Sequence, residues 1–176
     1  MTTIPIDIGH VRGSGSRGGD FEEHAMCEIL GDLLHKQLVD LGIDAPVIDF
    51  PDMTNTADLN ATVKALNNMT YDFGISLHMD ASDNKNARGA HVCYYSATGK
   101  KIATAIADEL IQLLPGRADK VVQRTGLAVL RDTKRPHVLI ECGFITNVND
   151  RSIVLSCMNA IAAKIVSGIK KYIGIK

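Results

Sequence analysis

Residues 73–81 read Phe73-Gly74-Ile75-Ser76-Leu77-His78-Met79-Asp80-Ala81. The first part of this stretch is a short, mostly apolar run with the length and composition of a buried strand. The run ends on a histidine and an aspartate. Open α/β sheets place ligand-binding and catalytic groups at the carboxyl ends of their strands. We therefore interpret the stretch as a buried strand that carries a functional group at its end.

Two other segments repeat this layout. They are Ile4-Pro5-Ile6-Asp7-Ile8-Gly9-His10 and Pro136-His137-Val138-Leu139-Ile140-Glu141. In each, an apolar run ends on a side chain that can bind a metal ion or transfer a proton. If the three segments are neighbouring strands, these side chains meet at one edge of the sheet.

The composition is that of a soluble globular protein with one domain. The chain has 176 residues, of which 45% are hydrophobic and 22% are charged, and its net charge is −1. This length is sufficient for one sizeable core, so we expect a single domain over residues 1–176. Lysine and arginine form no block along the chain, which argues against a nucleic-acid partner.

The sequence shows no targeting or membrane signal. Residues 1–7 contain neither a charged n-region nor an apolar h-region, so no signal peptide is visible. No uninterrupted apolar run approaches the ~20 residues of a membrane span, and we expect no membrane insertion. The cysteines are far apart and form no C-x-x-C pair, which predicts reduced thiols; they are Cys27, Cys93, Cys142 and Cys157.

Strand-like and helix-like segments alternate along the chain. We predict strands at 3–8, 46–50, 71–77, 89–95, 126–130 and 136–142, and helices at 20–41, 56–68, 98–114 and 149–172. Such alternation is typical of a three-layer α/β fold, an open, twisted, mostly parallel sheet flanked by helices. Two strand pairs have no helix between them, 71–77 with 89–95 and 126–130 with 136–142, and we expect some antiparallel pairing there.

The loop at 9–19 is rich in glycine but lacks a nucleotide-binding motif. Neither G-x-G-x-x-G with its acidic residue nor G-x-x-x-x-G-K-[ST] fits this segment. Asp20 then has the features of an N-cap, with Glu23 three residues later as a capping-box partner. We expect the helix to end at about Leu41, followed by Gly42 as the C′ residue.

Glu23 and Glu22 compete for a role at the start of this helix. Glu23 continues the apolar stripe of Met26, Leu30 and Leu34, so it faces the sheet, whereas Glu22 lies about 100° to one side. The simpler interpretation of Glu23 is a carboxylate that compensates the helix dipole. The alternative is a metal ligand that reaches over the strand ends.

His10, Glu23 and His78 form a plausible metal-ligand set. Zinc hydrolases use three ligands of this type and leave one position open for water. Glu141 could then take a proton from that water and pass it to a leaving amine, and Asp7 could orient His10. From the spacing alone, structural or surface histidines are the more common interpretation, because no H-E-x-x-H helix fixes the geometry.

The other histidines and Cys142 are interpreted as structural. The histidines lie on the first helix, in mid-strand or at a strand start; they are His24, His35, His91 and His137. Cys142 follows Glu141 within an apolar run, which favours an inert buried thiol over a nucleophile.

Several motifs together resemble a known family. In order they are Asp7-Ile-Gly-His10, Glu23 at a helix start, Ser76-Leu-His78-Met-Asp-Ala81, Gly89-Ala-His-Val-Cys-Tyr94 and Pro136-His-Val-Leu-Ile-Glu141-Cys-Gly-Phe-Ile-Thr-Asn147. This ordered set, spanning about residues 4–172, resembles the zinc-dependent N-acetylmuramoyl-L-alanine amidases (the Amidase_3 family) of cell-wall lytic enzymes and phage endolysins.

The resemblance implies an activity and a site. The activity is hydrolysis of the amide bond between N-acetylmuramic acid and L-alanine in peptidoglycan. The implied ligands of one Zn²⁺ ion are His10, Glu23 and His78. Zinc-bound water would act as the nucleophile and Glu141 as the general base and acid. The alternatives are a zinc peptidase acting on the stem peptide and a non-catalytic peptidoglycan-binding domain.

Two positions concern substrate contacts, and one expectation concerns location. Asp80 stands where the family commonly has asparagine, and Arg131 matches a position that is often basic. We expect both to contact substrate, although a solvated surface arginine is nearly as good an interpretation of Arg131. The missing signal fits synthesis in the cytoplasm and action on the cell wall after release or lysis, or a chain that lacks its export signal or a wall-binding module.

Overall fold

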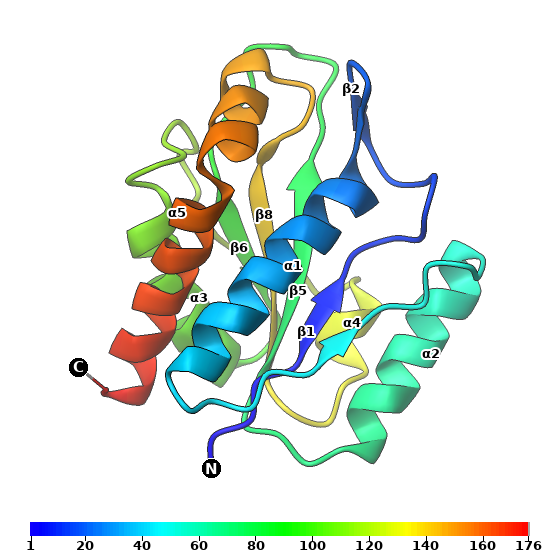
Figure 1. Ribbon diagram of the computed structural model, residues 1–176, viewed down its shortest axis with the longest axis vertical. Helices are drawn as coiled ribbons and strands as arrows, with labels where there is room; N and C mark the ends of the chain where they lie inside the picture. Colours follow the sequence, from blue (N-terminus) through cyan, green and yellow to red (C-terminus); the bar gives the residue numbers. More distant parts are fainter. Residues whose placement is uncertain (176) are drawn as a thin grey trace.

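A computed structural model describes residues 1–175; Lys176, the last residue of the predicted domain, lies outside the described residues. Figure 1 shows a central sheet with helices on both faces. Its six strands lie in the order β4-β1-β5-β8-β6-β7. Their bounds are β1 (Ile6–Ile8), β4 (Val47–Ile48), β5 (Gly74–Asp80), β6 (His91–Tyr94), β7 (Val121–Gln123) and β8 (His137–Phe144). A separate pair, β2 (Arg17–Gly18) and β3 (Phe21–Glu22), precedes the first helix.

The sheet is mixed and mostly parallel, as predicted. Within the described residues β6 runs antiparallel to β8, and the other neighbouring pairs of the six-stranded sheet are parallel. The helices are α1 (Glu23–Asp40), α2 (Asn55–Asn68), α3 (Ala97–Leu110), α4 (Ala128–Arg131) and α5 (Val148–Ile173). The three-layer α/β class is therefore confirmed.

The two faces of the sheet bury different sets of side chains. The larger cluster packs residues of α1, α3 and α5 against one face; it includes Leu30, Leu34, Ile75, Leu77, Ile102 and Ile165. The smaller cluster, beneath α2 and α4, includes Leu66, Val129, Leu130, Cys93 and Leu139. Because side chains alternate along a strand, β5 directs Ile75 and Leu77 to the larger cluster and Ser76 and His78 to the opposite face.

The connections of β1 create a switch point at the carboxyl edge of the sheet. The chain leaves β1 through α1 to reach β4 on one side, then returns through α2 to β5 on the other side. Right-handed crossovers in opposite directions put α1 and α2 on opposite faces of the sheet. The crevice between β1 and β5 is the place where open α/β sheets bind ligands.

One predicted strand is wrong. Residues 128–131 form the short helix α4, and the last edge strand is β7 at 121–123, between the helix predicted at 98–114 and the strand predicted at 126–130. The expected pairing of the segments 71–77 and 89–95 is also wrong, because β8 lies between β5 and β6. The antiparallel contact is instead made by β6 with β8. Local sequence gives no signal for which strand inserts between two others.

The predicted helix ends are confirmed in part. The first helix begins at Glu23 with Glu22 at the N-cap position, because β2 and β3 occupy the preceding residues, so the prediction of Asp20 as the cap is wrong. Gly42 has the predicted left-handed conformation, with φ of 76°. The cap of α5 is Asn147, whose side chain accepts from the backbone N–H groups of Asn149 and Asp150, so α5 begins one residue before its predicted start at 149.

Among the described residues, α5 alone is long and apolar enough to cross a membrane, with a mean hydropathy of 1.7 over its best window. Its apolar stripe contains Val154, Ile161, Ile165 and Ile169, all fully buried. Figure 1 shows α5 lying beside α1, and α5 also contacts α3. This is the packing of a helix that belongs to a protein core.

Candidate metal centre

His10 lies in the turn that follows β1. Its φ of 65° is left-handed, a conformation that is uncommon for residues other than glycine. The preceding Gly9 donates its backbone N–H to the carbonyl oxygen of Leu77 at 3.0 Å, which holds the turn against β5. This unusual backbone directs the imidazole of His10 toward His78, and the two ring centroids lie 5.0 Å apart.

His78 lies within β5, near its carboxyl end, on the face that α2 covers. The space for its ring exists because Gly9 has no side chain. A Cβ atom at Gly9 would lie 2.4 Å from Cε1 of His78, closer than real Cβ contacts come. Gly9 therefore allows the histidines of β5 and of the turn after β1 to approach each other.

Glu23 reaches the two histidines from the first turn of α1. Its side chain is buried, with 2% exposure, and Oε1 lies 3.0 Å from Nδ1 of His78 and 3.3 Å from Nε2 of His10. Oε1 also accepts the backbone N–H of Met79 at 3.0 Å, and Oε2 accepts that of Ser16 at 2.7 Å. These bonds fix the carboxylate in one orientation.

The charges in this group depend on one another. Burial acts to raise the pKa of Glu23, but hydrogen bonds from His10 and His78 outweigh it and hold that pKa well below its usual value. The same carboxylate raises the pKa of His10. Glu23 is thus anionic over the whole physiological range, as a metal-ligating carboxylate must be.

The residues fit a metal ion. Ligand atoms of His10, Glu23 and His78 all lie within 4.8 Å of one another. Two imidazole nitrogens and one carboxylate oxygen form a donor set that suits zinc and similar divalent ions. Gly15, with φ of 81°, leaves room for the carboxylate, because a Cβ there would lie 2.9 Å from Oε2 of Glu23. Gly9 beside His78 and Gly15 beside Glu23 thus leave the space in which the possible metal ligands come together.

Glu22 is directed away from the two histidines. Its carboxylate accepts the backbone N–H of Gly13 at 2.6 Å and pairs with Arg17 at 2.9 Å. The structure therefore brings Glu23, and not Glu22, to His10 and His78. The apolar stripe on α1 distinguishes the two glutamates, because the stripe continues toward the helix start to Glu23 and not to Glu22.

Glu141 faces the metal centre from the next strand. In β8 it is the registered partner of His78, so both side chains lie on the same face of the sheet. Its Oε2 atom is buried and has no hydrogen-bond partner among residues 1–175. Burial, with the charges of Asp80 and Glu23, raises the pKa of Glu141 to about 8. Such a carboxyl group can both hold and release a proton near neutral pH.

Asp80 ends β5 beside this carboxyl group. Its Oδ1 accepts the backbone N–H of Ala81 at 2.7 Å. Its Oδ2 lies 3.7 Å from both Nδ1 of His91 and Nη1 of Arg117. Burial raises the pKa of Asp80. Asp80 and Glu141 thus form a partly buried acidic pair, and Arg117 offsets some of its charge.

Asp7 does not contact His10. Its carboxylate accepts the hydroxyl of Ser76 at 2.6 Å and that of Thr62 at 3.4 Å, and within residues 1–175 no hydrogen bond joins it to His10. The structure therefore does not support the predicted orienting role. Because Asp7 lies inside β1 and His10 in the turn beyond it, their side chains leave the backbone in different directions.

Arg131 lies at the end of α4, outside the metal centre. It is 46% exposed and makes two hydrogen bonds of 2.7 Å to its neighbour Asp132. The same short helix contributes Ala128 and Val129 to a cleft beside the histidines. Arg131 therefore lies on the same short helix as two cleft residues, outside the group formed by His10, Glu23 and His78.

The remaining histidines and Cys142 have structural surroundings, as predicted. His24 pairs with Asp49, His35 with the carbonyl oxygen of Ala45, and His137 with the hydroxyl of Ser76. Burial lowers the pKa of His137 to about 3 and that of His91 to about 4. Burial also raises the pKa of the Cys142 thiol well above its usual value, so this thiol is a poor nucleophile.

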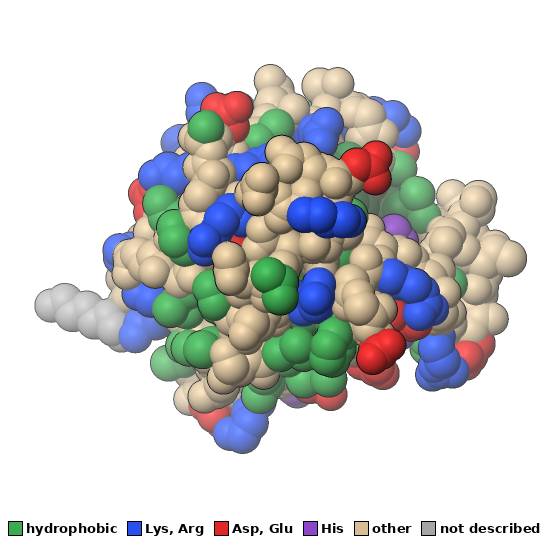
Figure 2. All heavy atoms as spheres, turned by 90° about the horizontal axis from the view of Figure 1, so that it is seen from above, with side chains coloured by type: hydrophobic (Ala, Val, Ile, Leu, Met, Phe, Trp, Pro, Cys, Tyr) green, Lys and Arg blue, Asp and Glu red, His purple; other side chains and the backbone are tan. Residues whose placement is uncertain are grey.

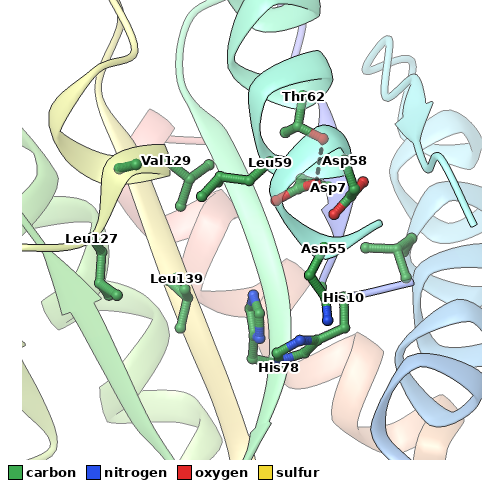
Figure 3. Close-up of a pocket in the computed structure, with 13 residues that line it drawn as sticks. Asp7, His10, Asn55, Asp58, Leu59, Thr62, His78, Leu127, Val129 and Leu139 are labelled. Atoms are coloured by element: carbon green, nitrogen blue, oxygen red, sulfur yellow. Dashed lines mark hydrogen bonds between the residues drawn. The ribbon is translucent and has the colours of Figure 1, made fainter. Parts of the chain in front are cut away.

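A cleft of about 220 Å³ adjoins His10 and His78, between α2, α4 and the carboxyl edge of the sheet. Figure 3 shows the two histidines at one side of it, Asp7, Asp58 and Thr62 at another, and Leu127, Val129 and Leu139 across from the acids. Figure 2 looks onto the edge where this cleft opens and shows a histidine in a recess beside hydrophobic side chains.

The acidic side of this cleft was not predicted. Apolar spacing within the helix predicted at 56–68 favours Leu59, Val63 and Leu66 as its inward face. The structure instead buries Asp58, Thr62 and Leu66 and leaves Leu59 38% exposed. The signal available was the spacing of Asp58, Thr62 and Leu66, which follows one helix face as well as the leucines do. An apolar template does not select a stripe that contains an aspartate.

Comparisons with known proteins identify a family and several relatives. A family model described as N-acetylmuramoyl-L-alanine amidase matches residues 4–171. The germination-specific N-acetylmuramoyl-L-alanine amidase of Bacillus subtilis is 29% identical over 119 residues, 65% of this chain and 50% of the relative. The chain thus spans about half the length of this curated relative.

Solved structures share the fold over almost the whole chain. The catalytic domain of the endolysin CD27L, which targets Clostridia difficile, has a TM-score of 0.90 and 28% identity, covering 97% of this chain and 98% of that domain. The catalytic domain of the amidase CwlV from Bacillus (Paenibacillus) polymyxa has a TM-score of 0.87, with 22% identity and full coverage of both chains (100% each), and at that identity shows the fold alone. With its family model matched over residues 4–171, the chain belongs to the N-acetylmuramoyl-L-alanine amidase family.

Proposed function

We propose that this chain hydrolyses the amide bond between N-acetylmuramic acid and the L-alanine of the peptide stem in peptidoglycan. The observation that carries the proposal is the convergence of His10, Glu23 and His78, whose possible ligand atoms all lie within 4.8 Å of one another. Glu141 lies next to this group, because it is paired with His78 in the register of β5 and β8. Family membership supports the choice of bond.

The proposed cofactor is one Zn²⁺ ion. His10 and His78 would hold it through Nε2 and Nδ1, and Glu23 through a carboxylate oxygen. When bound, the ion supplies a Lewis acid for the scissile carbonyl and for the attacking water. The backbone bonds from Met79 and Ser16 keep the Glu23 carboxylate in place when its histidine contacts change.

Glu141 has the proton-transfer role in this proposal. It takes a proton from the attacking water and then gives it to the departing amine of L-alanine, so that neither product leaves with an unfavourable charge. A pKa of about 8 suits both steps near neutral pH. Its buried Oε2 atom has no hydrogen-bond partner among residues 1–175, and we assign the proton transfer to this carboxyl group.

Asp80 and Arg131 are proposed as substrate contacts. Asp80 lies beside Glu141, and Arg131 is exposed at the end of the helix that lines the cleft. Replacing Arg131 by alanine should raise KM without lowering the melting temperature, because an exposed ion pair contributes little stability.

We also propose that the enzyme reaches the cell wall after release from the cytoplasm.

The test combines metal analysis with product analysis. The purified chain should carry one equivalent of zinc, and digestion of muropeptides should release free stem peptides while the glycan stays intact, as mass spectrometry can show. Glu141→Gln should retain zinc and lose about 10²–10⁴-fold in rate. Glu28→Gln, an exposed change of the same kind on α1, is the control. Cleavage within the stem would identify a peptidase instead, and no cleavage at all would favour a binding domain.

A further inference from the structure

The cleft beside the metal centre has two chemically different walls. Leu59, Leu127, Val129 and Leu139 form an apolar wall, and Asp7 and Asp58 lie together on the opposite wall. Pockets of this kind bind the apolar part of a ligand on one side and fix its polar group on the other. The polar group that fits here must be a cation or a strong hydrogen-bond donor.

Asp58 is the unusual member of this wall. It lies in the first turn of α2. An exposed carboxylate at this position would interact with the helix dipole as favourably as a buried one. It is instead 94% buried, since only 6% of it is exposed, and its Oδ1 atom has no hydrogen-bond partner among residues 1–175. Burying an unpaired carboxylate is costly, so a helix-end effect does not explain its position.

Lysine and arginine do not compensate these acids: within the described residues none forms a salt bridge with Asp7 or Asp58. His10 and His24 act to lower the pKa of Asp58, but burial and Asp49 outweigh them. Asp7 accepts the hydroxyls of Ser76 and Thr62, its side-chain hydrogen bonds among residues 1–175. Burial raises the pKa of Asp7 to about 7 and that of Asp58 to about 6, and neighbouring carboxylates add to both shifts.

We propose that this cleft binds an ammonium group carried on an aliphatic side chain, such as that of a diamino acid in the peptide stem. The ammonium lies between Asp7 and Asp58, and its methylene groups pack against the leucines and Val129. An ammonium is compact and sits on a flexible apolar stem, whereas a planar guanidinium needs a wider fork of acceptors. This inference rests on the proposed function, because the cleft adjoins His10 and His78.

The experiment uses two N-acetylmuramoyl tripeptides that end in lysine, one with a free side-chain amine and one with that amine acetylated. The zinc-loaded full chain should cleave the free-amine substrate with a kcat/KM at least about 10-fold higher, the effect of one hydrogen bond to a charged group. Asp58→Asn should bring the two substrates within about 3-fold of each other. Asp32→Asn, an exposed change on α1, should keep the preference.

A binding measurement separates this inference from the proposed function. Calorimetry with Glu141→Gln should show the same preference for the free amine without any turnover. If neither substrate is cleaved but the preference in binding persists, the proposed activity fails and the cleft assignment stands. Equal kcat/KM for both substrates, or an unchanged preference in Asp58→Asn, overturns the assignment. A second equivalent of zinc that disappears in Asp58→Asn overturns it as well.

Discussion

Gly9, which directly follows β1, lies beside His78 of the neighbouring strand β5 at the carboxyl edge of the sheet. The absence of a side chain at Gly9 leaves the space in which the imidazole of His78 lies. A Cβ atom added at Gly9 would lie 2.4–2.6 Å from three atoms of that ring. The backbone of Gly9 is not left-handed. This glycine is therefore needed for space, not for backbone conformation.

The first prediction concerns Gly9→Ala. The variant should fold, because its backbone conformation is open to alanine, but the ring of His78 must move away from His10 and Glu23. We expect zinc affinity to fall by about 10–100-fold, as for other changes that displace a ligand from its supporting contacts. Competition with a chelating indicator measures this. Gly126→Ala, where an added Cβ meets nothing within 4 Å, is the control. Unchanged zinc affinity in Gly9→Ala would contradict the packing argument.

The second prediction separates the two neighbouring glutamates. Glu23→Gln should lose stoichiometric zinc, because the ligand loses its charge and both histidines lose their anionic partner. Glu22→Gln should retain zinc and weaken only the loop contacts to Gly13 and Arg17. Elemental analysis of both purified variants makes the comparison. Zinc loss in the Glu22 variant alone would reverse the ligand assignment.

The sequence predicts the layers and the convergence of His10, Glu23 and His78 for a physical reason. His78 and Glu141 follow apolar runs with the length and composition of buried strands, and the carboxyl ends of parallel strands share one edge. Helical periodicity directs Glu23 to that same edge. These are local patterns, and the structure brings their side chains together.

Features that depend on long-range packing were not accessible in this way. The insertion of β8 between β5 and β6 is decided by contacts between distant segments, and the alternation of 89–95 is compatible with several partners. The orientation of Asp7 depends on hydroxyl groups of Ser76 and Thr62, which lie 69 and 55 residues away in the chain. Spacing relative to His10 contains no information about either hydroxyl.

The third prediction concerns Asp7→Asn. The ordinary pKa of this aspartate is 3.8, and the folded protein raises it to about 7. Between these values the unfolded chain has lost the proton while the folded chain still holds it, so stability falls as pH rises, by about 1.4 kcal/mol per unit. Asp7→Asn has no titrating carboxyl group at this position, so it does not lose this stability as pH rises. The difference in unfolding free energy between the variant and the wild type should grow from near zero at pH 4 to on the order of 4 kcal/mol at pH 8.

Urea titrations of the metal-free protein at several pH values measure this difference, and Asp32→Asn is the matched surface change. His91 and His137, whose pKa values are lowered, act in the opposite direction, but they contribute equally to both proteins and cancel in the comparison. Zinc affinity should change by less than about 3-fold, since no hydrogen bond joins Asp7 to His10. A larger loss of zinc would restore the orienting role.

The fourth prediction concerns Asp80 and the proton transfer by Glu141. The carboxylate of Asp80 raises the pKa of Glu141, and Arg117 acts against it. Asp80→Asn removes the repulsion and frees Arg117 from one anionic partner 3.7 Å away, so both effects lower the pKa of Glu141. In the proposed mechanism Glu141 acts first as a base, so the rising limb of the pH profile of kcat/KM should move to lower pH.

Asp83→Asn, in the exposed loop after β5, provides the control, and its profile should match that of the wild type. A limb that stays in place, or moves to higher pH, would show that Asp80 does not act on Glu141 through its charge. A rise in KM with an unmoved limb would instead assign Asp80 to substrate binding alone. The pH profile and KM together therefore decide what Asp80, two residues beyond His78, contributes to the proposed activity.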